Sequence, residues 1–229
     1  MKKIKISSIK EWAKEIDKLD VKENLNWIKN NFGKVVGMTT AFGYSGVVLM
    51  HHIKEIMPEV DIFFIDTGYH FTETLELFKR VKKEWNLNLK ILKPYFEKKD
   101  LKKIIGAKPY KINPNLCCHY LKVEPLLRVL HTKKVWISAI RRDQTFTRSQ
   151  KSKIELDGRG VIKINPLLNW PRDKTWNYIK LNKLSYNPLH DKGYSSIGCK
   201  PCTDKTPEGG DERDGRWKSM PKFECGINR

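Results

Sequence analysis

The spacing of apolar residues changes near residue 34, from helical intervals to short continuous runs. Before it, apolar residues recur at helical spacing at Ile9, Trp12, Ile16 and Leu19. Ser8 can cap this first amphipathic helix. Asp20 and Glu23 have the spacing of a capping box for a second helix, which we expect to end at Gly33. Residues 1–33 are therefore predicted to form an N-terminal helical segment that serves packing.

From residue 34 onward, apolar runs of strand length alternate with amphipathic stretches. The runs occupy 35–39, 60–65, 89–93 and 134–139, and the helical patterns occupy 46–56 and 72–85. A hairpin is expected over 152–165, turning at Asp157-Gly158-Arg159-Gly160, and another helix over 173–181. Strands that alternate with helices predict an α/β fold with a parallel sheet, whose ligands bind at the carboxyl ends of the strands.

Two loops, Thr40–Ser45 and Asp66–Gly68, follow predicted strands and are expected to line that ligand site. Backbone N–H groups at the start of a helix attract anions. The first loop has neither a Walker lysine nor the Ser-Gly-Gly-x-Asp-Ser motif of enzymes that split ATP into AMP and pyrophosphate. Gly46 stands where that aspartate would be. The sequence thus disfavours magnesium–pyrophosphate chemistry and is compatible with a nucleotide that lacks a triphosphate.

Length and composition limit the possible domain organisation and cellular location of the protein. The chain has 229 residues and fits one domain with appendages. It shows no apolar run of membrane length, and polar residues such as Ser7 and Lys10 interrupt the start of the chain, where a signal peptide would be apolar. We therefore expect a cytoplasmic protein without a membrane partner, in a compartment where cysteines serve metal binding or catalysis rather than disulfides.

The formal net charge of +19 can be interpreted in several ways. It is compatible with a solvated lysine-rich surface, an anionic substrate, an acidic partner protein or nucleic acid. The lysines are spread along the chain and do not gather in a tail, which argues against a dedicated nucleic-acid reader.

The five cysteines divide into two pairs and a single residue. Cys117 and Cys118 are adjacent, Cys199 and Cys202 form a C-x-x-C hook, and Cys225 lies near the last residue. Four thiolates are the ligand set of an iron–sulfur cubane or a Cys₄ zinc site. Because consecutive helical side chains diverge by about 100°, the adjacent pair favours a wide [4Fe–4S] cluster over zinc, a vicinal disulfide or structural thiols. Cys225 is then the free thiol available for nucleophilic chemistry.

Several segments together carry a family resemblance. They are Cys117–Leu126, Arg141–Gln144 with Thr147-Arg148, Asn187–Tyr194 leading to Cys199–Thr203, Arg213–Trp217, and Glu224-Cys225-Gly226. These segments resemble the motifs of assimilatory adenylyl-sulfate reductases over roughly residues 35–228. The resemblance implies an adenine-nucleotide alpha-hydrolase-like fold, related to the PP-loop enzymes. One departure is the end of the chain, where the family usually has histidine and this sequence has Asn228-Arg229.

The resemblance also implies a reaction and a site. Cys225 would attack the sulfur of adenosine 5′-phosphosulfate, expel AMP and carry an S-sulfonate, from which thioredoxin or a similar dithiol donor would release sulfite. Cys117, Cys118, Cys199 and Cys202 would hold a [4Fe–4S] cluster. Substrate contacts are expected from Thr40, Phe42, Gly43, Ile65, Asp66, Thr67, Lys122, Ala139, Arg148, Arg213 and Arg216. Residues 34–202 would form the nucleotide- and cluster-binding domain, and 203–229 an exposed lid with a mobile catalytic tail.

Three alternatives stay open at this point. The first is a reductase that prefers the 3′-phosphorylated substrate, 3′-phosphoadenylyl sulfate. The second is an iron–sulfur enzyme of the PP-loop group, such as an RNA-thiolating one, against which Gly46 and the terminal Cys225 speak. The third is a non-catalytic zinc or cluster protein that binds nucleic acid, which leaves Cys225 unexplained. A homo-oligomer is compatible with each of them.

Overall fold

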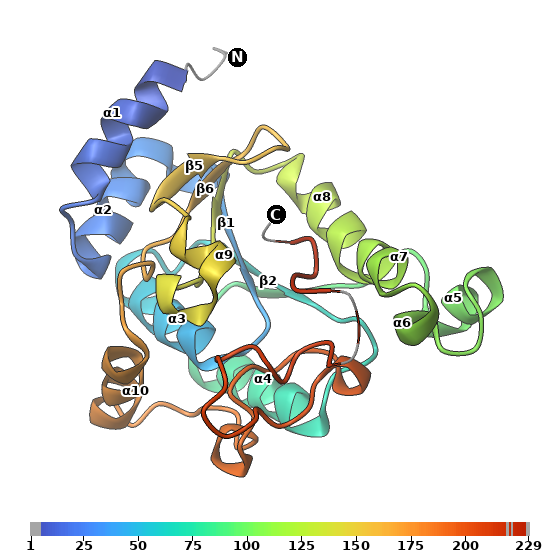
Figure 1. The fold of residues 1–229 in the computed structure, drawn as a ribbon. Helices are drawn as coiled ribbons and strands as arrows, with labels where there is room; N and C mark the ends of the chain where they lie inside the picture. Colours follow the sequence, from blue (N-terminus) through green and yellow to red (C-terminus); the bar gives the residue numbers. More distant parts are fainter. Residues whose placement is uncertain (1–5, 219, 221, 228–229) are drawn as a thin grey trace.

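A six-stranded sheet lies at the centre of the computed structural model, which describes residues 6–218, 220 and 222–227 (Figure 1). The strands are β1 Val36–Thr40, β2 Asp61–Ile65, β3 Leu89–Leu92, β4 Val135–Ile137, β5 Ile154–Leu156 and β6 Ile162–Ile164. Their order in the sheet is β3-β2-β1-β4-β6-β5, and all neighbours are parallel except the hairpin partners β5 and β6. The predicted α/β class is confirmed.

The helices cover both faces of this sheet, except α5, α6 and α7, which lie to one side of it (Figure 1). They are α1 Ile6–Ile16, α2 Val21–Phe32, α3 Tyr44–Ile56, α4 Thr72–Glu84, α5 Lys98–Ile104, α6 Pro109–Ile112, α7 Pro114–Cys118, α8 Glu124–Leu130, α9 Phe146–Ser149 and α10 Arg172–Leu181. The alternation of side chains along β4 separates the two layers. Val135 and Ile137 join the main core with α1 to α4 and α10, whereas Trp136 faces Leu126 and Leu130 of α8.

The structure confirms the predicted ends of α2 but not the predicted starts of α1 and α3. The capping box of α2 is confirmed, because Glu23 N donates to Asp20 Oδ1 at 2.9 Å and Asp20 N donates to Glu23 Oε2 at 2.8 Å. Gly33 ends this helix with a φ of +53°, as expected. The predicted cap at Ser8 is wrong, since α1 already begins at Ile6. Helix α3 likewise begins at Tyr44, two residues before the predicted start.

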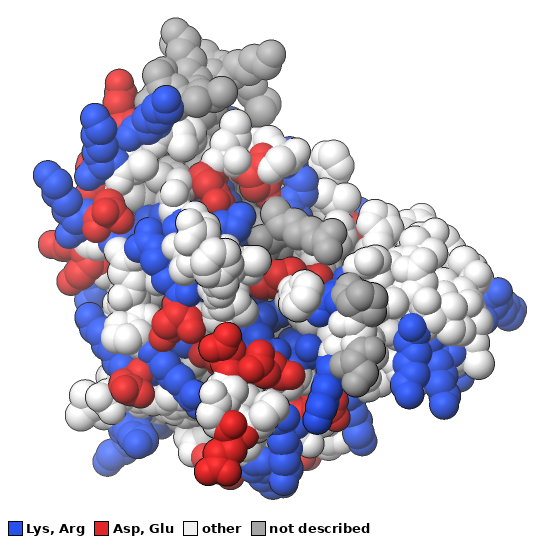
Figure 2. All heavy atoms as spheres, in the orientation of Figure 1, with Lys and Arg blue, Asp and Glu red and all other residues white. Residues whose placement is uncertain are grey.

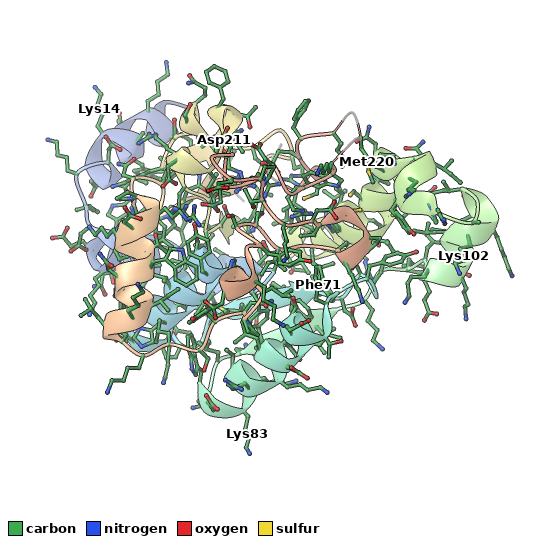
Figure 3. The ribbon with its side chains drawn as sticks, turned by 60° about the horizontal axis from the view of Figure 1, so that its bottom comes forward. Lys14, Phe71, Lys83, Lys102, Asp211 and Met220 are labelled. Atoms are coloured by element: carbon green, nitrogen blue, oxygen red, sulfur yellow. The ribbon has the colours of Figure 1, made fainter. Side chains whose placement is uncertain are left out.

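The segment after the cysteine hook differs from the exposed loop that its polar sequence suggested. Residues 207–211 are exposed, but Glu212, Arg216 and Trp217 are buried, and Thr203 forms an isolated β-bridge with Arg216. Figure 3 shows the stretch between Asp211 and Met220 crossing in front of the sheet. Glu212 folds inward because the partners that satisfy it, Tyr44, Arg141 and Gln144, lie at the sheet's carboxyl edge.

The face of the molecule drawn in Figure 2 shows no single dominant basic patch. Lysine and arginine side chains are spread over the face drawn in Figure 2, with acidic side chains interspersed. Among the residues that the structure describes, no helix combines the length and the apolar character needed to cross a membrane.

Candidate active site

A cavity of about 210 Å³ opens at the carboxyl ends of β1, β2 and β4. The loop between β1 and α3 forms one side, residues 195–199 form another, and the chain from Glu212 to Ile227 covers the opening. The expected contacts that line it are Thr40, Gly43, Ile65, Thr67, Lys122, Ala139, Arg148, Arg213, Arg216 and Cys225. Segments that are far apart in the sequence are thus brought together where the parallel sheet predicts a ligand site.

Two of the expected contacts do not line this cavity. The ring of Phe42 lies in the main core, 5.4 Å from that of Phe64 and 5.7 Å from that of Phe78. Asp66 accepts a hydrogen bond from the backbone N–H of Gly68 at 2.9 Å and so shapes the turn after β2. Both residues set the course of loops that border the site, and their side chains point elsewhere.

The lack of a side chain at Gly46, on the first turn of α3, has a direct steric reason. A Cβ atom built there would lie 2.9 Å from Thr40 Oγ1, which accepts the backbone N–H of Phe42 at 3.1 Å. An aspartate at position 46 would force this loop to move. The structure therefore agrees with the sequence argument against magnesium–pyrophosphate chemistry.

Cys225 is half-buried in the cavity beside a set of positive groups. Burial by itself would raise the pKa of this thiol. The positive charge of Lys122, a hydrogen bond from the backbone N–H of Ile227 and the charge of Arg213 outweigh burial, so the pKa lies below that of an ordinary cysteine. A larger fraction of Cys225 is therefore thiolate at neutral pH, which is the nucleophilic form.

Two arginines bond Glu224, the residue before Cys225, and a third lies in the same cavity. Arg148 Nε donates to Glu224 Oε1 at 2.8 Å, and Arg213 Nη2 donates to Oε2 of the same carboxylate at 3.2 Å. Arg216 lies against the backbone of Gly198, where any Cβ atom would meet its guanidinium, and donates to Cys202 O at 3.3 Å. Burial, Arg148 and Arg216 lower the pKa of Arg213, since like charges crowd it. Such a group attracts an anion.

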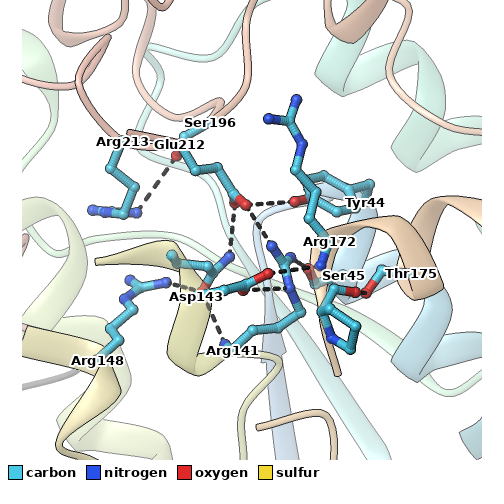
Figure 4. A network of polar contacts seen from close by, with 12 residues as sticks. Tyr44, Ser45, Arg141, Asp143, Arg148, Arg172, Thr175, Ser196, Glu212 and Arg213 are labelled. Atoms are coloured by element: carbon cyan, nitrogen blue, oxygen red, sulfur yellow. Dashed lines mark hydrogen bonds and ion pairs between the residues drawn. The ribbon is translucent and has the colours of Figure 1, made fainter. Parts of the chain in front are cut away.

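A second carboxylate, Glu212, joins the covering segment to the sheet, and sequence reasoning missed it (Figure 4). Its oxygens accept hydrogen bonds from the hydroxyl of Tyr44 at 2.5 Å, from Arg141 Nη2, and from Gln144 Nε2 at 2.9 Å. Arg141 is fully buried and also bonds Ser45 and Asp143. A buried arginine needs a carboxylate partner. In the sequence, the indication of this carboxylate partner is the acidic residue directly before Arg213.

The four remaining cysteines surround a second cavity that adjoins the first. Cys117, Cys118, Cys199 and Cys202 line it together with Tyr69 and Tyr110, and each is 5–7% exposed. Lys122 and Cys199 line both cavities and so link them. All five cysteines are free thiols, which excludes a vicinal disulfide here. The described residues contain no group of three or more His, Cys, Asp or Glu side chains placed to hold a single metal ion.

The four cysteines can become thiolates together only if a positive centre compensates them. Burial and the neighbouring cysteines raise the pKa of Cys117 to about 12 and that of Cys202 to about 11, so without a cation these thiols keep their protons at neutral pH. Four thiolates at one place would need a cation of their own. The backbone also departs from a regular α-helix directly after the pair, because His119–Val123 forms a π-helical turn that carries Lys122. The residues present fit a metal centre wider than one ion.

A parallel α/β sheet with an arginine-lined cavity at its carboxyl edge and a reactive cysteine over it defines a nucleotide-binding enzyme fold with a thiol active site. Residues 35–205 match the phosphoadenosine phosphosulfate reductase domain. The chain is 41% identical to adenosine 5′-phosphosulfate reductase 2 of Bacillus subtilis, over 93% of this chain and 90% of that one. It is 37% identical to the adenosine 5′-phosphosulfate reductase of Halalkalibacterium halodurans, over 99% and 97%.

Solved structures agree. The phosphoadenylyl-sulfate reductase of Candida auris, in its phosphate complex, superposes with a TM-score of 0.79 at 32% identity, covering 88% of this chain and 98% of that one. Yeast FAD synthetase, in complex with FAD, superposes with a TM-score of 0.60 at 17% identity over 89% and 70%. This second likeness shows the fold alone. The chain belongs to the phosphoadenosine phosphosulfate reductase family.

One predicted feature lies outside the described residues. Asn228 and Arg229, the positions at which this sequence departs from the family, are not among the described residues. The described part of the tail runs from Lys222 to Ile227. The division of the chain into 1–33, 34–202 and 203–229 stays a prediction. Within the structure, α1 and α2 contribute Ile16 and Leu25 to the same core as the sheet.

Proposed function

We propose that the protein reduces adenosine 5′-phosphosulfate to sulfite and AMP through a covalent intermediate on Cys225. The observation that carries the proposal is the position of Cys225, in one cavity with Lys122 and Arg213 and close to the loop before α3. A thiolate surrounded by cations is placed to attack an anionic, electrophilic sulfur. The relatives from Bacillus subtilis and Halalkalibacterium halodurans are named for this reaction.

The reaction has two displacement steps at sulfur. In the first, the Cys225 thiolate forms an S–S bond with the sulfate sulfur, the bond from that sulfur to the phosphate oxygen breaks, and AMP leaves with the electron pair. In the second, one thiol of a dithiol donor attacks Cys225 Sγ and sulfite leaves with its electron pair. The donor's second thiol then forms the donor's internal disulfide and frees Cys225. We propose thioredoxin or a similar dithiol protein as this donor.

The side chains around Cys225 have separate roles in the first step. The planar guanidinium groups of Arg213 and Arg216 suit the oxygens of a sulfate or phosphate, and the Nε of Arg213 is buried without a hydrogen-bond partner among the described residues. Thr40 and Gly43 border the start of α3, where backbone N–H groups attract the adenylate phosphate. Ile65, Thr67, Ala139 and Arg148 complete the expected contacts with the nucleotide and sulfate.

Cys117, Cys118, Cys199 and Cys202 are proposed to hold a [4Fe–4S] cluster. The support is their shared buried cavity and the need of four thiolates for positive charge. When bound, the cluster supplies a fixed charged centre and stays at one redox level. Burial alone would lower the pKa of Lys122, but the thiolates of Cys199, Cys118 and Cys225 raise it. Lys122 therefore keeps its proton and faces the sulfate site from the cysteine side.

Two alternatives fit the chain less well. The Candida auris relative acts on the 3′-phosphorylated nucleotide, but curated relatives of higher identity are named for the unphosphorylated one. An RNA-thiolating enzyme would need ATP activation, and this chain has Gly46 in place of the aspartate that serves magnesium; the Cβ atom of an aspartate there would lie 2.9 Å from Thr40 Oγ1. We also propose a cytoplasmic location, where five free cysteines stay reduced.

The test offers each ³⁵S-labelled nucleotide to anaerobically purified protein without a reductant. We expect label to accumulate on the protein with adenosine 5′-phosphosulfate, to be released as sulfite when thioredoxin is added, and to be missing in Cys225→Ser. Faster labelling by 3′-phosphoadenylyl sulfate would favour the alternative substrate. Label that persists in Cys225→Ser, or no label with either nucleotide, would overturn the proposal.

A further inference from the structure

The tail that carries Cys225 runs between α8 and the β5–β6 hairpin before it leaves the described part of the chain (Figure 1). The side chain of Ile227 packs against the cluster of Ile65, Leu126, Leu130, Trp136 and Val161 on the sheet face that α8 also covers. The residues just after the reactive cysteine are thus seated on the sheet, and the hairpin is their neighbour on one side.

Arg159, in the turn of this hairpin, makes the direct contact. Its Nη2 donates to the backbone carbonyl oxygen of Ile227 at 2.8 Å. Three further contacts hold the guanidinium where it can do so. Nε donates to Asp157 Oδ2 at 2.7 Å, Nη2 forms an ion pair with the same oxygen at 2.5 Å, and the guanidinium carbon lies 5.0 Å from the ring centre of Trp136. The backbone N–H of Arg159 also bonds Asp157 Oδ1, which fixes the turn.

Ile227 is connected to the sulfur by more than sequence. Its backbone N–H bonds the Cys225 thiolate. Between them Gly226 adopts a φ of +88°, a left-handed conformation that glycine reaches without strain. A Cβ atom built on Gly226 would lie 3.1 Å from Cγ2 of Val123, so the turn runs close to the π-helical segment. Holding residue 227 therefore holds the direction in which Cys225 points.

We infer that Arg159 is a positioning residue that seats the catalytic tail through the carbonyl of Ile227 and so aims Cys225 at the bound nucleotide. The inference rests on the proposed function of Cys225. Arg159 does not line the substrate cavity, so its effect passes through the tail. Its side chain is 18% exposed and its bond to the tail lies at the edge of the sheet.

The first test substitutes Arg159→Met, which keeps an apolar stem over Trp136 and removes the donor. We expect single-turnover transfer of ³⁵S label to Cys225 at saturating adenosine 5′-phosphosulfate to slow by about tenfold, as misplacement of a reacting group predicts. The dissociation constant of AMP should stay unchanged, which separates positioning from substrate binding. Arg159→Lys should recover part of the rate, because a lysine can still donate to the carbonyl.

Arg128 of α8 offers a matched control. It also donates to a backbone carbonyl, that of Lys93, and pairs with Glu124 at 2.7 Å, and neither contact involves the tail. Arg128→Met should leave the transfer rate at the wild-type value. A loss of rate in Arg128→Met equal to that in Arg159→Met would show a general effect of removing a surface arginine and would overturn the inference.

The second test asks whether Arg159 acts through the tail. Removing residues 227–229 deletes the carbonyl acceptor, so Arg159→Met should have no further effect in the shortened chain. Hydrogen exchange of the peptide 223–229, followed by mass spectrometry, should be faster in Arg159→Met than in wild type. Equal exchange, or additive effects of the two changes, would contradict the inference. A wild-type protein that takes up no label would instead refute the proposed function. The hydrogen-exchange comparison would still test whether Arg159 holds the tail.

Discussion

The hydroxyl of Tyr44, on the first turn of α3, donates a 2.5 Å hydrogen bond to Oε2 of Glu212, which lies 168 residues later in the chain. This bond ties the loop that begins the nucleotide site to the segment that covers it. The next residue after Glu212 is Arg213, which reaches toward Glu224 beside Cys225. Arg148 joins Gln144, a partner of Glu212, to Glu224. The nucleotide loop, the arginines and the tail are therefore parts of one connected polar network, of which Figure 4 shows the part around Glu212.

Removing the carboxylate of Glu212 should destabilise the protein strongly. In Glu212→Ala the buried Arg141 loses its carboxylate partner, and the free energy of unfolding should fall by about 3–5 kcal/mol. In Tyr44→Phe only a neutral donor is lost, and the fall should be about 1 kcal/mol. Urea unfolding of both variants measures the difference. A loss in Glu212→Ala no larger than that in Tyr44→Phe would show that Arg141 finds other partners.

Cys225→Ser should keep the nucleotide and the iron while losing sulfite production. A serine hydroxyl is barely ionised at neutral pH, and an S-sulfonate cannot form on it. AMP binding by calorimetry, iron content and sulfite release are the three measurements. Sulfite formation near the wild-type rate would assign the nucleophile to another residue.

Arg213→Ala and Arg216→Ala should each weaken the binding of the sulfonated nucleotide or slow label transfer by about 1.5–3 kcal/mol, the range for hydrogen bonds to charged groups. Arg213→Lys is the matched variant, since it keeps the charge and loses the fork that can bond two oxygens. Label transfer at subsaturating nucleotide reports both effects. Normal transfer in both alanine variants would leave these arginines with a structural role alone.

The protein is expected to be brown and to contain about four irons and four sulfides. Cys199→Ser should lower the iron content, because Cys199 lines the cavity shared by the four thiols. Removing the iron should lower the melting temperature, since the ligands fold around the metal. Iron and sulfide analysis after anaerobic purification checks the composition. A colourless protein with stoichiometric zinc would be the contrary outcome.

Stability should fall in acid because several histidines are buried in their neutral form. Burial lowers the pKa of His52 to about 4, and it also lowers the pKa values of His51, His70 and His190. The unfolded chain takes up these protons first, so the stabilisation is complete above pH of about 6.5 and is lost as pH falls toward 4. For His52 it amounts to about 3 kcal/mol at most.

The measurement is urea unfolding at pH 7.5 and pH 5. The ring nitrogens of His52 have no hydrogen-bond partner among the described residues, so His52→Gln should make stability less dependent on pH. His131 is exposed, and His131→Gln should leave the pH dependence as it is in wild type. The same slope in wild type and His52→Gln would remove His52 as a source of acid sensitivity.

The sequence by itself determined the fold class and the family, and it singled out Cys225 as the proposed nucleophile. Short β-branched runs between amphipathic stretches can only be buried as strands under helices, so the parallel sheet and its ligand edge followed from local pattern. The Asp20–Glu23 capping box acts within four residues and was readable for the same reason. The cysteine pairs set apart Cys225, because thiols have few roles in a reducing compartment.

Tertiary structure alone decided which side chains meet around that cysteine. The polar stretch 203–222 is expected to be exposed because charged residues usually face water, yet Glu212 and Arg216 are buried. Glu212 bonds Tyr44 of α3 and Gln144 of the 3₁₀ turn at 142–144, and Arg216 bonds Cys202 of the cysteine hook. Likewise nothing local in the hairpin turn indicated that Arg159 would reach the carbonyl of Ile227. The contacts of Glu212 with Tyr44 and Gln144 and of Arg159 with Ile227 join positions 68 to 168 residues apart. They depend on how the chain returns to the sheet edge, and no short-range pattern of residues encodes that path.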